Sequence, residues 1–162
     1  MKRLKVAIVM GSDSDLPTMD EAAKVLGEYG VEYEIKILSA HRSPDDTAKF
    51  AKSARARGFG VIIAGGGGAA ALAGVIASHT TLPVIGVPME TKELKGIDSL
   101  FSTVQMPSGV PVATLTIGKT GAKNAAILAL EILAIRDKTI EKRLLTLKKS
   151  LAESVRKKNI RS

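Results

Sequence analysis

An imidazole and a guanidinium stand side by side in this sequence at His41 and Arg42, shortly after Ser39. The preceding residues, 31–38, alternate polar with β-branched and aromatic side chains, which predicts a strand, and Pro44 is typical of the first turn of a helix. An imidazole can donate or accept a proton near neutral pH, and a guanidinium can bind a phosphate or a carboxylate through two hydrogen bonds. Because ligands of open α/β sheets bind at the carboxyl ends of strands, we expect Ser39, His41 and Arg42 to carry chemistry.

Ser43 has a structural explanation. It precedes Pro44 and stands three residues before Asp46, a spacing that resembles a capping box with Asp where Glu or Gln is usual. We therefore expect the Ser43 hydroxyl to cap a helix that runs to about residue 57, where Gly58 closes it.

A second polar loop, residues 11–15, follows the apolar run of residues 5–10, which predicts a buried strand. The hydroxyls of Ser12 and Ser14 and the backbone N–H groups of a helix start suit a phosphate, and Asp15 could accept hydrogen bonds from ribose hydroxyls. Helix capping by the same side chains is the alternative. The loop is not a Walker A loop, because no Gly-Lys-Ser/Thr sequence follows it.

Four consecutive glycines, residues 65–68, follow the apolar run 61–64 and precede three alanines. They expose backbone N–H groups and let a ligand come close, although a tightly packed turn is the alternative. The loop follows the third predicted strand rather than the first, and no acidic residue ends the next strand, which argues against a nicotinamide cofactor. Residues 88–107 are polar enough to line the same site but include nothing diagnostic.

The remaining residues indicate no metal site and no covalent nucleophile. The chain has no Cys, and its second imidazole, His79, is expected at a helix end, where a cation complements the helix dipole. Two His and scattered acids lack the spacing of metal ligands.

The net charge of +8 belongs mainly to the end of the chain. From residue 136 onward there are ten Lys and Arg against three Asp and Glu, whereas the first 135 residues carry fourteen against thirteen. The segment 138–157 is expected to form a helix with one apolar stripe and Lys and Arg on its other faces. The stripe consists of Ile140, Leu144, Leu147, Leu151 and Val155. This pattern predicts either binding to a membrane or nucleic acid or packing on its own or a neighbouring subunit. The stripe has no aromatic residue, which favours packing. We expect no nucleic-acid or membrane partner and, since the N-terminal apolar run is too short for a signal peptide, a cytoplasmic protein.

Strands and helices are predicted to alternate along the chain, which indicates a parallel sheet with helices on both faces. Short connections favour a three-layer α/β/α, flavodoxin-like arrangement over residues 1–136, with residues 137–162 as a basic amphipathic C-terminal helix of the same unit. The predicted strands are residues 5–10, 31–38, 61–64, 83–88 and 110–117.

Six segments carry a resemblance to a known family: residues 10–15, 39–44, 61–65, 83–88, 98–107 and 121–126. In this order along the chain, they resemble the aminoimidazole ribonucleotide carboxylase family of purine biosynthesis. The resemblance implies a flavodoxin-like subunit, a homo-octamer, and neither a metal nor an organic cofactor. It also implies a reaction that moves a carboxylate from the exocyclic nitrogen to ring carbon 4 of an aminoimidazole ribonucleotide, by decarboxylation and recarboxylation.

The same resemblance implies roles for individual residues. His41 would be the general acid and base, and Ser12, Asp15 and Arg42 would bind the ribonucleotide. The other residues expected in the pocket are Ser14, Ser39, Gly67, Gly68 and Ala69.

Two positions depart from the family's glycine-rich loop, where Ala71 replaces the usual His and Ala73 the usual Pro. Three activities therefore stay open: a mutase, a direct carboxylase that uses CO2, and a weakly active nucleotide-binding relative. The direct carboxylases typically have Lys where this chain has Arg42, which favours the mutase.

Overall fold

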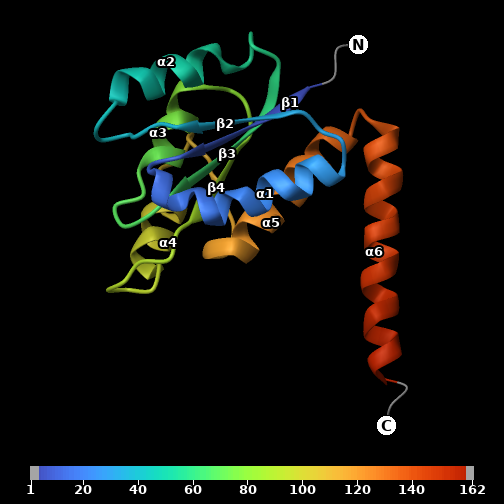
Figure 1. Cartoon of the computed structure of the whole chain (residues 1–162). Helices are drawn as coiled ribbons and strands as arrows, with labels where there is room; N and C mark the ends of the chain where they lie inside the picture. Colours follow the sequence, from blue (N-terminus) through green and yellow to red (C-terminus); the bar gives the residue numbers. More distant parts are fainter. Residues whose placement is uncertain (1–3, 160–162) are drawn as a thin grey trace.

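Five parallel strands form the central sheet of the computed structural model, which describes residues 4–159 (Figure 1). The strands lie in the order β2-β1-β3-β4-β5, the flavodoxin-like order. Their bounds are β1 Lys5–Met10, β2 Tyr33–Ile37, β3 Phe59–Gly66, β4 Val84–Pro88 and β5 Ala113–Thr114. The predicted three-layer α/β fold is therefore confirmed.

Helices cover both faces of this sheet. Alternate side chains of β1 point to opposite faces, so that Ile8 joins one hydrophobic core with α1 and α5, while Val9 joins a second core with α2 and α3. In residues 4–159 the helices, with one short 3-10 turn, are η1 Asp13–Asp15, α1 Leu16–Glu28, α2 Pro44–Ala54, α3 Leu72–His79, α4 Ile97–Val104, α5 Gly118–Ala134 and α6 Lys138–Asn159. The start of α5 lies close against the residues that precede it, because a Cβ at Gly121 would collide with the carbonyl oxygen of Thr116.

The fifth strand is much shorter than residues 110–117, which the apolar pattern predicted. Only Ala113 and Thr114 pair with β4. Pro111 has no N–H to donate to a ladder, and β5 is an edge strand with one neighbour. Little besides the bond from Leu115 N to Gly86 O at 3.0 Å therefore holds the flanking residues to the sheet.

The capping interaction predicted for Ser43 is also absent. Ser43 does occupy the position before α2, but its hydroxyl makes no hydrogen bond to the helix. Instead it accepts a hydrogen bond from Ser39 N at 3.1 Å and lies 3.2 Å from Ser39 O. The side chain closes the preceding turn onto itself, and α2 ends at Ala54, slightly before the predicted end.

The C-terminal helix α6 extends beyond the rest of the fold (Figure 1). Its first half is anchored: Ile140 and Leu144 are buried in the α1–α5 core, and Arg143 Nη2 donates to Glu28 O at 2.6 Å. In the second half, Leu151 and Val155 continue the same stripe but are 54% and 57% exposed. None of the helices in the described part of the chain is both long and apolar enough to cross a membrane.

Candidate active site

Three loops meet at the carboxyl ends of the adjacent strands β2, β1 and β3, where they enclose a pocket of about 420 Å³. Eight of the nine site residues expected from the sequence line this pocket: Ser12, Ser14, Asp15, Ser39, His41, Arg42, Gly67 and Ala69. The other lining residues are Gly11, Ala40, Gly66, Ala70, Ala71 and Leu72. Gly68 is the exception, because its backbone is bonded to α4 outside the pocket.

The loop after β1 contributes hydroxyl groups and one carboxylate. The Ser14 hydroxyl donates to Ser12 Oγ at 3.0 Å, and Asp13 Oδ1 accepts from Ser14 N at 3.0 Å, so Asp13 stabilises the loop. Asp15 lies at the pocket wall. Its partial burial raises the pKa of that carboxyl, with a smaller contribution from the nearby charge of Asp13, while a hydrogen bond from the Ser12 backbone opposes the shift.

The turn after β2 presents the imidazole and the guanidinium. Ser39 Oγ accepts from Arg42 N at 3.1 Å and from Arg42 Nε at 3.4 Å. Arg42 Nη2 donates to Gly11 O at 2.9 Å, so this side chain joins the turn to the loop after β1. No hydrogen bond to another residue in the range 4–159 holds the exposed His41 ring, which leaves both of its nitrogens available to a ligand.

The loop after β3 contributes backbone rather than functional side chains. Gly66 O accepts from Met89 N at 2.8 Å, which continues the pairing of β3 with the chain beyond β4. Within residues 4–159, no acceptor takes the N–H group of Gly67 or Ala69. Donors of this kind beside Arg42 suit an anionic ligand, and the small Ala side chains leave room for it.

Sequence reasoning missed the residues that hold this loop. Ser99 and Ser102 of α4 both contact the backbone of Gly68. They belong to the polar segment 88–107, which we expected at most to line the pocket and which instead lies behind it. The four adjacent glycines were the available signal, since such a loop needs an external support.

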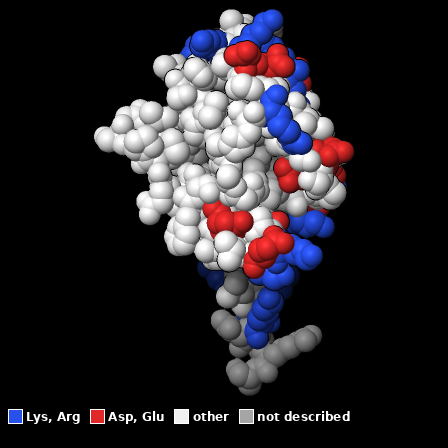
Figure 2. All heavy atoms as spheres, turned by 90° about the vertical axis from the view of Figure 1, so that its left-hand side faces the viewer, with Lys and Arg blue, Asp and Glu red and all other residues white. Residues whose placement is uncertain are grey.

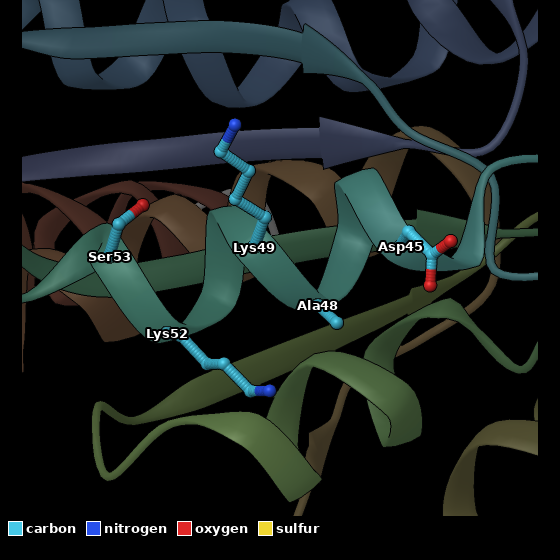
Figure 3. A pocket seen from close by; sticks show the side chains of 5 residues that line it. All are labelled: Asp45, Ala48, Lys49, Lys52 and Ser53. Carbon is cyan, nitrogen blue, oxygen red and sulfur yellow. The ribbon is translucent and has the colours of Figure 1, made fainter.

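A second hollow, of about 480 Å³, lies along α2 (Figure 3). It is larger than the pocket, but its lining comes from one helix face, and Lys49 and Lys52 point in opposite directions. It therefore lacks convergent groups that could bind or transform a ligand.

The face to which the strands point is unevenly charged (Figure 2), and the described residues hold no cluster of metal ligands. Figure 2 views the molecule from the side to which β1 and β2 point, and much of that face carries neither Lys and Arg nor Asp and Glu. No cluster of three His, Asp or Glu in the described part of the chain could hold a metal ion. His79 is the last residue of α3 and is not part of the pocket lining.

A flavodoxin-like sheet with a polar pocket at its carboxyl edge defines an α/β protein with a small-molecule site. The family model described as AIR carboxylase matches residues 5–154, and the chain belongs to that family.

Proteins named N5-carboxyaminoimidazole ribonucleotide mutase are among its relatives. That of Pyrococcus horikoshii is 58% identical over 153 residues, which are 94% of this chain and 85% of the relative. The Escherichia coli K12 protein is 52% identical over 151 residues, covering 93% and 89%. The crystal structure of Treponema denticola PurE superposes with a TM-score of 0.87 at 30% identity, covering 96% of each chain.

Proposed function

We propose that this chain is a mutase of purine biosynthesis that converts N5-carboxyaminoimidazole ribonucleotide to 4-carboxy-5-aminoimidazole ribonucleotide. Membership of the AIR carboxylase family and the names of its relatives support this reaction. The observation that carries the proposal is the pocket itself, in which an imidazole, a guanidinium, three hydroxyls and a carboxyl from two loops converge beside the backbone of the glycine-rich loop.

The pocket offers a separate group for each part of such a substrate. Arg42, with the hydroxyls of Ser12 and Ser14, binds the phosphate, because a guanidinium and hydroxyl donors match phosphate oxygens. Asp15 accepts hydrogen bonds from the ribose hydroxyls. Gly67 and Ala69 approach the substrate through their backbone N–H groups.

His41 moves the protons of the reaction. Protonated His41 donates to the exocyclic nitrogen as the N–CO2 bond breaks, which releases CO2 and leaves the aminoimidazole ribonucleotide. Carbon 4 then attacks CO2, and neutral His41 accepts the proton that carbon 4 loses. The ring thus ends in the protonation state in which it began, and no cofactor or ATP is required.

Trapping CO2 between the two steps requires a site from which water is excluded. In the single chain, His41 and Arg42 are exposed, so cover must come from elsewhere. A homo-octamer of this chain, acting in the cytoplasm, is part of the proposal, and the exposed apolar side chains of Ile97, Phe101 and Val104 on α4 are available for subunit contacts. Light scattering of the purified protein checks the assembly, and a monomeric active enzyme contradicts it.

A turnover assay with both candidate substrates tests the reaction. Purified protein is expected to convert N5-carboxyaminoimidazole ribonucleotide without ATP and without dependence on added CO2, and His41→Asn is expected to lower kcat at least about 100-fold, as loss of a general acid and base does. His79→Asn is the matched control and should leave kcat unchanged. Turnover of aminoimidazole ribonucleotide that depends steeply on free CO2 would instead indicate the direct carboxylase, and a fully active His41→Asn protein would exclude the mechanism.

A further inference from the structure

One residue of the glycine-rich loop, Gly68, is bonded through its backbone to two hydroxyl groups of α4. Ser99 Oγ accepts a hydrogen bond from Gly68 N at 2.9 Å. Ser102 Oγ lies 3.0 Å from Gly68 O and 2.7 Å from Asp98 O, so its single proton is shared between the two carbonyl oxygens. The Ser99 side chain belongs to a fully buried residue, whereas Ser102 is exposed, which makes the Ser99 bond the better protected of the two.

Gly68 is the residue of this loop at which support has the most effect. It stands between Gly67 and Ala69, which both line the pocket, and its φ of +65° lies in the left-handed region. Glycine has many accessible conformations, and ordering such a residue costs backbone entropy. A hydrogen bond to a buried hydroxyl offsets part of that cost by favouring one conformation of the loop.

The helix that supplies these hydroxyls is itself fixed at its start. Thr91 Oγ1 donates to Asp98 Oδ1 at 2.7 Å and accepts from Gly96 N at 3.0 Å. These bonds hold the first turn of α4 to the chain that follows β4. These bonds therefore fix the position from which the Ser99 hydroxyl reaches Gly68.

We propose that Ser99, supported by Ser102, is a positioning residue for the ribonucleotide site, an inference that rests on the proposed function. Neither serine lines the pocket. Ser99 acts by keeping Gly68 in the conformation in which the N–H groups of Gly67 and Ala69 face the ligand. When only a fraction of the molecules has a competent loop, the apparent dissociation constant rises in inverse proportion to that fraction. Loss of the hydroxyl therefore acts on binding and leaves His41 in place.

Kinetics of the full-length protein with Ser99→Ala test this inference. We expect KM to rise about tenfold, the effect of losing a hydrogen bond to a buried group, while kcat stays within about twofold of the original value. Thr103→Val is the matched control: Thr103 is also buried on α4, at 3% exposed, but its hydroxyl donates within the helix to Ser99 O at 2.7 Å. This control should leave KM unchanged.

Amide hydrogen exchange gives a second readout that does not depend on turnover. Exchange at Gly67, Gly68 and Ala69 is expected to accelerate in Ser99→Ala and not in Thr103→Val. Calorimetric titration with 4-carboxy-5-aminoimidazole ribonucleotide should show the same weakening as KM. Ser102→Ala, at an exposed position, serves if Ser99→Ala does not fold, and we expect a KM rise of about twofold to threefold from it.

The outcomes separate this inference from the proposed function. Unchanged loop exchange and unchanged affinity in Ser99→Ala overturn the positioning role even when the wild-type enzyme turns over. Equal effects in Thr103→Val also overturn it, because they indicate general damage to α4. A wild-type protein without turnover contradicts the proposed function, and the exchange and titration measurements still decide whether Ser99 positions the loop.

Discussion

The turn after β2 and the glycine-rich loop after β3 border the same pocket but are held in different ways. In the turn, Ser43 Oγ accepts from Ser39 N, and Ser39 Oγ accepts from Arg42 N, so all of these partners lie within five consecutive residues. In the loop, Gly68 is held by Ser99 and Ser102, which follow it by 31 and 34 residues.

This difference matches what each segment contributes. The turn carries His41 and Arg42, whose side chains need a rigid backbone beneath them, and a short self-bonded turn provides one. The glycine-rich loop contributes its own N–H groups, and its glycines have no side chains. Its local bonds are backbone ones, from Ala70 N to Gly68 O at 2.9 Å and from Ala71 N to Ala69 O at 2.8 Å, and its side-chain support comes from another part of the fold.

The largest effect is expected from the turn. Arg42→Ala removes both the proposed phosphate ligand and the hydrogen bond to Gly11 O, and we expect KM to rise about 100-fold, since hydrogen bonds to charged groups are the strong ones. Arg42→Lys should recover only part of this loss, because an ammonium group cannot make the paired hydrogen bonds of a guanidinium. Steady-state kinetics measures both variants, and an unchanged KM in Arg42→Ala would remove Arg42 from the binding site.

A side chain added to the loop should have a smaller effect. Ala71 lines the pocket at the position where the family resemblance led us to expect His, so Ala71→His places an imidazole on the glycine-rich side. If the present chain is limited by that absence, kcat rises about tenfold, at the low end of the contribution of a positioned acid or base. An unchanged kcat indicates that His41 alone suffices for proton transfer, and a fall shared with Ala71→Asn indicates that the larger side chain obstructs the pocket.

The smallest effect is expected from a methyl group at Gly68. The added Cβ of Gly68→Ala meets no atom within 4 Å, but the positive φ costs about 1–2 kcal/mol of unfolding free energy for an L-residue. Gly30→Ala is matched to it, with a φ of +67° and equally open surroundings, and it lies at the far end of α1. Denaturant unfolding should show similar losses of stability in both variants, and kinetics a KM increase of a few-fold in Gly68→Ala alone. Equal KM values would show that the loop conformation does not matter for binding.

Much of the site could be predicted from local sequence. The alternation of side chains predicted β2, and the apolar runs predicted β1, β3 and β4. The polar residues after these strands converge because parallel strands end at one edge of the sheet. Eight of the nine expected site residues line one pocket for this reason. A flavodoxin-like order with the first strand near the centre was sufficient to bring their loops together.

Three features could not be predicted in this way. The Ser43 hydroxyl bonds to Ser39 rather than to its helix, β5 shortens to Ala113–Thr114, and the stripe on α6 is covered only in its first half. The first depends on which of several backbone groups the hydroxyl bonds to. The other two depend on how far a neighbouring strand or helix extends, and the local sequence pattern does not contain this information.

By itself, the sequence determined which residues could do chemistry and on which loops they stand, because residue type, turn signals and hydrophobic period act over a few positions. Only the tertiary structure decided how the glycine-rich loop is held. Its support comes from the hydroxyl groups of a helix distant in sequence, and a hydrogen bond between Ser99 and Gly68 exists only once β3, β4 and α4 have packed together.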